Sequence, residues 1–154
     1  MTATTYDSLR ERLEQTIAAA PTHHAAMTAA VQLLKDQVPA YSWVGIYLLE
    51  GQELVLGPFL GKPSPHTRIQ LNAGICGAAA TEKATIIVDD VDADPRYLAC
   101  SLETRSEIVV PIMRGDAVLG EIDIDSDQKA AFGGADRDLL EATAAALAKR
   151  FPTS

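Results

Sequence analysis

Apolar residues near the start of the chain recur with the period of an α-helix. Over residues 6–19 they stand four positions apart with charged residues between them, at Leu9, Leu13 and Ile17. Such a stripe is typical of an amphipathic helix that packs on one face. Pro21 and Thr22 provide a start signal for a second helical pattern, which Pro39 ends. The N-terminal part of the chain therefore predicts two helices joined by a short turn.

The pattern changes at Ser42 to two apolar and aromatic runs, SWVGIYLLE and ELVLGPFL, which flank a Gly-Gln pair at residues 51–52. Two such runs around a tight, glycine-containing turn predict a β-hairpin. Side chains alternate between the two faces of a strand. Trp43, Gly45 and Tyr47 are therefore expected on one face, opposite the apolar residues between them.

The middle of the chain combines short elements with irregular connections. Residues 61–68 carry two prolines and predict a loop, and a short strand is expected at residues 69–71. A short helix is expected to begin at Gly74, and another strand covers residues 85–90. Residues 91–106 form a long irregular connection, and a loop of that length in a compact domain is usually functional or disordered.

Strand patterns return towards the C-terminus. The runs EIVVPIM and AVLGEIDID flank a turn at residues 114–116 and predict a second hairpin. Asp136 is expected to cap a final helix over residues 137–150, which is rich in Ala and Leu. The order of these elements predicts an α+β fold with a mostly antiparallel sheet and helices packed against it.

Length and composition indicate an ordinary soluble protein. A chain of 154 residues fits a single domain, with N-terminal helices in residues 1–40 and the sheet with its flanking helices in residues 42–150. The net charge of −8 argues against nucleic acids and anionic membranes as partners. The sequence has no apolar stretch of signal-peptide or transmembrane length, so a cytoplasmic location is expected.

Carboxylates alternate with apolar residues in the segment GEIDIDSD. The strand period places Glu121, Asp123 and Asp125 on one face. Glu107 begins the preceding strand of the hairpin and is expected close to them. Exposure to solvent is the common fate of alternating charge on an antiparallel sheet. The alternative is a cationic ligand held by this acidic face.

The chain has two cysteines, Cys76 in GICG and Cys100 in YLACS. A nucleophilic cysteine is partly exposed and held as thiolate by cations or a helix N-terminus. Cys100 lies in a polar loop near two arginines, and Cys76 lies at the start of a helical segment, where free backbone N–H groups lower a thiol's pKa. Burial as a small apolar side chain is the alternative for both. His66 lies in a predicted loop, where a lone histidine is usually exposed to solvent. The alternative is that it binds a transition metal together with the cysteines.

Trp43 is the only tryptophan of the chain, and it forms an aromatic pair with Tyr47 on either side of Gly45. A glycine between two aromatic residues is expected to leave room for a ligand. Packing in the core is the alternative, because large aromatic side chains dominate protein cores.

Several motifs follow one another from about Trp43 to the C-terminal helix: WVGIYLL, LVLGPFLGKP, RIQLNAGICGAAA, DDV, YLACS, TRSEIVVPI and VLGEIDIDS. In order and nearly in spacing they resemble the free methionine-R-sulfoxide reductases, a branch of the GAF domain family. The resemblance implies a GAF fold, with a six-stranded antiparallel sheet flanked by helices, and a cytosolic homodimer. It implies reduction of free methionine sulfoxide without a cofactor or metal, through a sulfenic acid and a disulfide that thioredoxin reduces.

The resemblance assigns roles to the two cysteines. Cys100 matches the cysteine that attacks the sulfoxide sulfur, and Cys76 matches the cysteine of the family's GVCG motif. Three positions differ from the family. The family usually has a third cysteine at the position of His66, a histidine at the position of Tyr97 and an aspartate at the position of Ser101. Resolution of the sulfenic acid is therefore expected to use Cys76 or an external thiol, or not to occur.

The resemblance also assigns the substrate-binding residues, which are Trp43, Tyr47, Glu107, Asp123 and Asp125. In the family, the aromatic residues enclose the methyl group. The carboxylates bind the amino group or assist protonation of the sulfoxide oxygen. Glu121 departs from the pattern, because the family has an apolar residue there.

Three hypotheses for function follow. The first is a two-cysteine reductase in which Cys100 attacks and Cys76 resolves. The second is a binding or sensor module that keeps a pocket for an amino-acid-like ligand without efficient turnover, because a fold alone does not fix an activity. The third is a metal or redox-sensing site built from His66, Cys76 and Cys100, although the sequence gives these residues no ligand spacing.

Overall fold

The computed structural model describes residues 3–97 and 103–152, and a six-stranded sheet lies at its centre. The strands are β1 (Trp43–Glu50), β2 (Glu53–Leu60), β3 (Arg68–Gln70), β4 (Ile86–Val88), β5 (Ser106–Arg114) and β6 (Ala117–Ser126). Their order in the sheet is β3-β2-β1-β6-β5-β4, and all neighbours are antiparallel. The predicted α+β fold and both predicted hairpins are confirmed.

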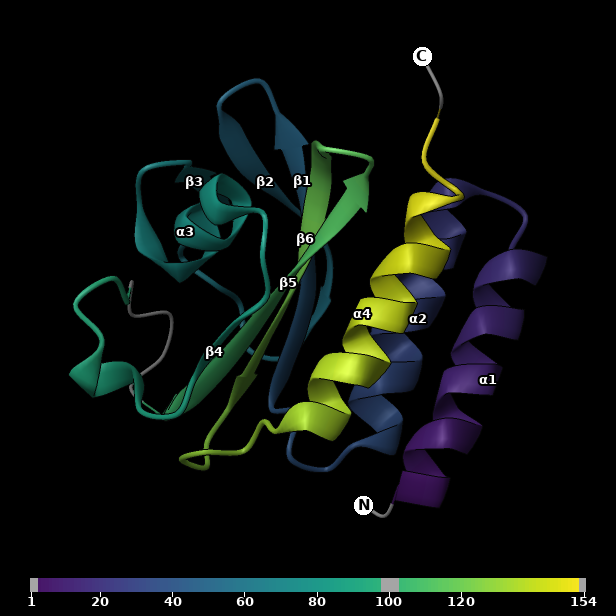
Figure 1. Cartoon of the computed structure of the whole chain (residues 1–154), viewed down its shortest axis with the longest axis horizontal. Helices are drawn as coiled ribbons and strands as arrows, with labels where there is room; N and C mark the ends of the chain where they lie inside the picture. The colour runs from purple at the N-terminus through teal and green to yellow at the C-terminus, as the bar shows by residue number, and fades with distance from the viewer. Residues whose placement is uncertain (1–2, 98–102, 153–154) are drawn as a thin grey trace.

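Helices cover the two faces of the sheet unequally. The helices α1 (Ala3–Ala19), α2 (His23–Gln37) and α4 (Gly134–Ala148) form a layer on one face, and the short helix α3 (Gly74–Glu82) lies on the other (Figure 1). A 3-10 helix, η1 (Val91–Ala93), follows β4 within the segment expected to be irregular. No helix in the described part of the chain has the length and apolar character that crossing a membrane requires.

The strands divide their side chains between two apolar clusters, one on each face of the sheet. The cluster beneath the three-helix layer includes Ile46, Ile108, Ile122 and Ile124 from the strands and Leu13, Leu34 and Leu140 from the helices. The cluster on the α3 face includes Trp43, Tyr47 and Val109 from the strands and Ile75, Cys76 and Ala79 from α3. Alternation along β1, β5 and β6 therefore sends successive residues to two different environments.

The two predicted helix caps have different outcomes. Thr22 caps α2 as expected, because its hydroxyl accepts a hydrogen bond from the backbone N–H of Ala25 over 3.0 Å. Asp136 also caps its helix, but from a different position than expected, since α4 begins at Gly134, Gly133 is the N-cap, and the Asp136 carboxylate accepts the Gly133 backbone N–H as the N3 residue of a capping box. Asp136 lies inside the first turn.

Three donors hold Asp136 in that first turn. Its carboxylate accepts hydrogen bonds from the Tyr41 hydroxyl over 2.6 Å, the Tyr6 hydroxyl over 2.8 Å and the backbone N–H of Gly133 over 2.9 Å. Tyr6 lies on α1 and Tyr41 precedes β1, so one carboxylate joins three parts of the helical layer. The same carboxylate therefore caps α4 and ties it to α1 and to the segment before β1.

Candidate functional site

Strands β1 and β6, at the centre of the sheet, bring the predicted aromatic and acidic residues together. Their register pairs Trp43 with Asp125, Gly45 with Asp123, and Tyr47 with Glu121. On the next strand, Glu107 pairs with Asp125. These residues alternate with those of the helix-facing cluster, so they share the α3 face of the sheet. The predicted alternation is confirmed, and it includes Glu121, which the expected substrate-binding set leaves out.

The four carboxylates on this face are buried, and we call them the acidic row. The exposed fractions are 5% for Glu107, 0% for Glu121, 2% for Asp123 and 3% for Asp125. Helix α3 covers this face of the sheet (Figure 1), and its apolar residues join the same cluster as Tyr47. The interpretation of the face as a solvent-exposed strand surface is therefore wrong, because a helix distant in sequence lies over it.

Burial raises the pKa of each β6 carboxyl above its ordinary value, because low-dielectric surroundings disfavour the charged form. For Glu121 and Asp125, the charge of Asp123 adds to the rise. For Asp123 and Asp125, hydrogen bonding with Glu107 acts in the opposite direction and partly offsets the rise in pKa. Within the described ranges, no Lys, Arg or His forms an ion pair with these three carboxylates. The acidic row therefore suits a bound cation or a proton to be passed to a ligand.

Cys76 reaches the acidic row from the first turn of α3. Its Sγ donates a hydrogen bond to Asp123 Oδ2 over 3.4 Å, and its side chain is 5% exposed. The glycine that follows allows this approach, since a Cβ at Gly77 would lie 2.8 Å from the Leu71 carbonyl oxygen. The helix start thus brings the thiol against the sheet.

The surroundings of Cys76 oppose ionisation. Burial raises the pKa of its thiol well above the ordinary value, and the negative charges of Asp123, Glu121 and Glu107 raise it further. The expectation that the helix start lowers this pKa is therefore wrong. Desolvation and neighbouring carboxylates outweigh the backbone N–H groups.

Trp43 and Tyr47 lie side by side, with ring centroids 6.4 Å apart. Hydrogen bonds orient both rings, because Trp43 Nε1 donates to the Lys62 carbonyl over 2.9 Å and the Tyr47 hydroxyl donates to the His66 carbonyl over 2.7 Å. Both partners belong to the loop between β2 and β3. This loop therefore fixes the aromatic pair against the sheet.

Gly45 has a different role from the one expected. A Cβ at this position would lie 2.3 Å from Trp43 Cη2 and 2.6 Å from Cζ3. The indole ring itself occupies the space above the glycine, so Gly45 admits the tryptophan and leaves no room there for a ligand. Any ligand space has to lie on the other sides of the aromatic pair.

Two pockets adjoin the acidic row. The larger has a volume of about 240 Å³ and is lined by Trp43, Lys62, Ser64, Glu103, Thr104 and Asp125, among others. An ion pair between Lys62 and Glu103 joins two sides of this pocket, from segments far apart in sequence. The smaller pocket is lined by residues that include His66, Cys76, Glu107 and Asp123. The sequence offered no signal for Lys62 and Glu103, since neither lies in a periodic pattern or a motif of charge.

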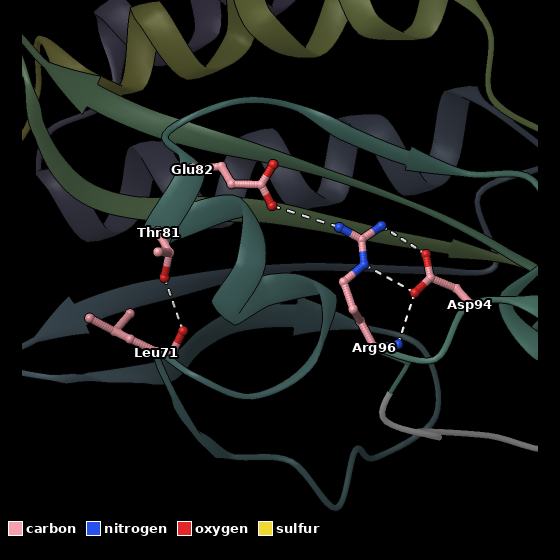
Figure 2. Close-up of polar contacts among 5 residues, drawn as sticks. All are labelled: Leu71, Thr81, Glu82, Asp94 and Arg96. Carbon is pink, nitrogen blue, oxygen red and sulfur yellow. Dashed lines mark hydrogen bonds and ion pairs between the residues drawn. The ribbon is translucent and has the colours of Figure 1, made fainter.

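Cys100, the expected attacking cysteine, and Ser101 lie outside the described residues. The segment just before them is described, and Arg96 fixes it. Figure 2 shows Arg96 between Asp94 and Glu82, with Nη2 2.8 Å from Asp94 Oδ2 and Nη1 3.7 Å from Glu82 Oε2. Glu82 ends α3, the helix that carries Cys76 in its first turn. Arg96 therefore links the segment that precedes Cys100 to α3, the helix that carries Cys76.

A further contact in Figure 2 fastens the same helix to the strand side. The Thr81 hydroxyl donates a hydrogen bond to the Leu71 carbonyl over 3.1 Å. Leu71 directly follows β3. Helix α3 is thus held both by the β3 end and by Arg96.

The expected metal-binding trio of His66, Cys76 and Cys100 stays a prediction, because Cys100 lies outside the described residues. Among the described residues, the side chains close enough to share a metal ion are Cys76, Glu107 and Asp123, whose ligand atoms lie within 4.8 Å of one another. His66 lines the same pocket but does not belong to this group.

Comparisons with known proteins show the family to which the chain belongs. The family described as "GAF domain" matches residues 22–151. Free methionine-R-sulfoxide reductase of Saccharomyces cerevisiae is 44% identical over 112 residues, which cover 70% of this chain and 62% of that protein. The enzyme of the same name from Escherichia coli is 34% identical over 130 residues, which cover 84% of this chain and 78% of that protein.

A solved structure is similar over almost the whole chain. It is the free methionine-R-sulfoxide reductase of Neisseria meningitidis in complex with its substrate, with a TM-score of 0.92 and 37% sequence identity. The match covers 97% of this chain and 89% of that one. The similarity therefore includes both the sheet that carries the acidic row and the helices around it.

Proposed function

The chain belongs to the GAF domain family and is related to the free methionine-R-sulfoxide reductases, and on this premise we propose that it reduces free L-methionine-(R)-S-oxide to methionine. The observation that carries the proposal is the buried acidic row beside an aromatic pair. A zwitterionic amino acid with a sulfoxide offers an ammonium for the carboxylates and a methyl group for the rings. Related proteins with substrate bound support the same assignment.

The acidic row supplies recognition and a proton. Glu107 and Asp125 pair across β5 and β6 and hold the substrate ammonium, which offsets the cost of their burial. Burial raises the pKa of Asp123, so this carboxyl holds its proton more tightly than an ordinary aspartate does and is the group that donates it to the sulfoxide oxygen. Trp43 and Tyr47 enclose the methyl group through ring contacts.

The chemical step belongs to Cys100. Its thiolate attacks the sulfoxide sulfur and forms a sulfur–sulfur bond while the sulfoxide oxygen takes up a proton. The resulting hydroxyl passes to the Cys100 sulfur, the sulfur–sulfur bond breaks with its electron pair going to methionine, and a Cys100 sulfenic acid remains. The Cys76 sulfur then displaces the hydroxyl of the sulfenic acid, which leaves as water, and a disulfide forms. Asp123, within 3.4 Å of the Cys76 sulfur, is placed to accept the thiol proton in this second step.

The working form that we propose is a cytosolic homodimer without a bound cofactor. A disulfide formed in each cycle needs a dithiol reductant to be reduced again, and thioredoxin has this chemistry. A coupled assay with thioredoxin, its reductase and NADPH tests the reductant. Light scattering in solution tests the dimer.

Consumption of substrate tests the proposal directly. Purified protein with dithiothreitol is expected to reduce the R epimer of free methionine sulfoxide and to leave the S epimer unchanged. Cys100→Ser is expected to abolish this activity, and the matched exposed substitution Ser8→Ala on α1 is expected to leave it unchanged. Absence of turnover in the wild-type protein, or full activity in Cys100→Ser, would overturn the assignment.

One observation favours a second candidate, a binding module without efficient turnover. Cys76 is buried among carboxylates that keep its thiol protonated, and His66 stands in the neighbouring pocket wall in place of a further thiol. If the Cys76 thiol reacts slowly with the Cys100 sulfenic acid, the protein binds its ligand but completes few catalytic cycles. Calorimetry with methionine and its sulfoxide distinguishes the two, since tight binding without product supports the binding module.

A further inference from the structure

Three ligand groups of the smaller pocket converge from three different elements. Cys76 on α3, Glu107 on β5 and Asp123 on β6 place their ligand atoms within 4.8 Å of one another. All three side chains are buried, with exposed fractions of 5%, 5% and 2%. In a tetrahedral zinc site with the usual bond lengths, a thiolate and a carboxylate oxygen lie about 3.5 Å apart. The 3.4 Å between Cys76 Sγ and Asp123 Oδ2 already matches this spacing.

Glu121 provides an independent sign that a positive partner belongs here. Its side chain is completely buried, hydrogen bonding with the Cys76 thiol only partly offsets the effect of burial on its pKa, and no Lys, Arg or His in the described part of the chain forms an ion pair with it. It lies close enough to Cys76 for its charge to act on that thiol. Asp123 Oδ1 lacks a hydrogen-bond partner among the described residues. A buried carboxylate without a partner is costly unless it is protonated or a cation compensates for it.

The mixed donor set selects the kind of cation. Magnesium and calcium take oxygen ligands alone, whereas a thiolate next to carboxylates suits a borderline ion such as zinc. The net charge of −8 favours the approach of any cation to the protein. His66 lines the pocket beside these ligands and adds a nitrogen donor to its wall.

We propose that Cys76, Glu107 and Asp123 form a binding site for Zn²⁺, with Glu121 as the additional carboxylate that compensates its charge. Binding replaces the proton of the Cys76 thiol, so zinc uptake releases a proton to solvent. Glu107 and Asp123 belong to the acidic row that holds the substrate, and zinc therefore excludes the substrate and occupies the resolving thiol. This inhibitory consequence rests on the proposed reductase function, whereas the binding itself does not.

Cobalt makes the site visible without any substrate. The whole protein is reduced with a phosphine, freed of metal by a chelator and titrated with Co²⁺, which reports thiolate ligation by a sulfur-to-cobalt charge-transfer band. One equivalent is expected to produce the band, and one equivalent of Zn²⁺ is expected to remove it. Calorimetry with Zn²⁺ alone measures the affinity and, in buffers of different ionisation enthalpy, the released proton.

Matched variants assign the ligands. Cys76→Ser is expected to lose the band, whereas Cys100→Ser retains it and serves as the control for the other thiol. Glu121→Gln is expected to keep the band and to weaken zinc binding by about tenfold or more, as outer-sphere partners of metal sites do. If Cys76→Ser does not fold, the wild-type band and the Cys100→Ser band still decide the matter.

The outcomes separate this site from the reductase assignment. No band in the wild-type protein, a band that Cys100→Ser removes, or an unchanged zinc affinity in Glu121→Gln would each overturn the zinc site. A protein that shows the band and reduces no sulfoxide supports the zinc site and overturns only the proposed activity. A protein that shows no band and reduces sulfoxide at an unchanged rate with excess zinc overturns the zinc site and supports the proposed activity.

Discussion

The Cys76 thiol donates its hydrogen bond to Asp123, so the sulfur on α3 and the carboxylate on β6 share one proton across 3.4 Å. The two residues are 47 positions apart in the sequence. Their contact joins the covering helix to the acidic row. A reaction that changes the charge of one partner therefore changes the protonation of the other.

Substitution of Cys76 should separate the first turnover from the later ones. In Cys76→Ser, we expect about one methionine per protein and then a fall of the thioredoxin-supported rate by about tenfold or more, because the sulfenic acid has no thiol to resolve it. Dimedone labelling followed by mass spectrometry measures the sulfenic acid on Cys100. A steady-state rate equal to that of the wild-type protein would show that an external thiol resolves the intermediate.

Glu121 should make the folded state less stable as the pH rises. Burial raises the pKa of Glu121 above its ordinary value of 4.5, so the folded protein binds this proton more tightly than the unfolded chain. Its stabilising contribution is complete at low pH and is lost as the pH rises towards the raised value. As the pH rises above the ordinary value of 4.5 towards the raised one, the urea midpoint of the wild-type protein should therefore fall more steeply than that of Glu121→Gln.

An exposed carboxyl gives the control for this experiment. Glu11→Gln, on the solvent side of α1, is expected to retain the wild-type slope of midpoint against pH. Asp123 and Asp125 leave a residual slope in Glu121→Gln, since their pKa values are raised as well. Identical slopes for Glu121→Gln and the wild-type protein would contradict the prediction.

Asp136 should contribute strongly to stability. Asp136→Ala removes the shared acceptor of Tyr6, Tyr41 and Gly133 and leaves the buried Tyr41 hydroxyl without its partner. The expected loss is about 2–4 kcal/mol in the free energy of unfolding. Chemical denaturation measures it, with the exposed Asp138→Ala on the same helix as the control. A loss no larger than that of the control would refute the role of this carboxylate.

Gly45 should matter through the tryptophan that lies over it. Gly45→Ala forces a Cβ into the space of the Trp43 ring, 2.3 Å from Cη2, so the indole has to move. We expect ligand binding to weaken by about tenfold, equivalent to about 1.4 kcal/mol. Trp43 is the only tryptophan, so intrinsic fluorescence reports both its displacement and the ligand titration. Gly134→Ala, where a Cβ meets nothing within 4 Å, is the control.

Arg96 should affect turnover more than stability. Its ion pairs with Asp94 and Glu82 are partly exposed, and such pairs contribute less than about 1 kcal/mol. They nevertheless link the segment before Cys100 to α3, so Arg96→Ala is expected to lower the rate of sulfenic acid formation several-fold. Arg68→Ala, which removes an ion pair with Glu53 outside both pockets, is the control. Equal single-turnover rates in the two variants would argue against this link.

Local periodicity was sufficient to predict which side chains share a face. The strand period placed Trp43 and Tyr47 together, and likewise Asp123 and Asp125, because alternation depends only on neighbouring residues. It could not predict that the carboxylates are buried. That property depends on α3, whose contact with β6 joins residues distant in sequence.

The remaining differences also have long-range causes. Asp136 caps α4 as its residue type predicted, but its carboxylate also binds Tyr41, 95 positions away, and no local pattern indicates that contact. The helix start at Cys76 predicted a lowered thiol pKa, but burial of the thiol, together with the carboxylates of β5 and β6, raises it. The pocket beside Trp43 includes Lys62 and Glu103, which are 41 positions apart and which no sequence pattern brings together. Local sequence patterns therefore predicted which side chains share a face of the sheet, but not their burial or their long-range partners.

The alternation along β6 ties the chemistry of this protein to its spacing. Glu121, Asp123 and Asp125 face the pocket side, while Ile122 and Ile124 between them fill the helical core. Every second residue of β6 therefore faces the same side of the sheet. A single insertion or deletion within it would send carboxylates into the helical core and isoleucines into the site, even with every residue type retained. Changes in chain length at this site can be absorbed only in the turns, outside β6.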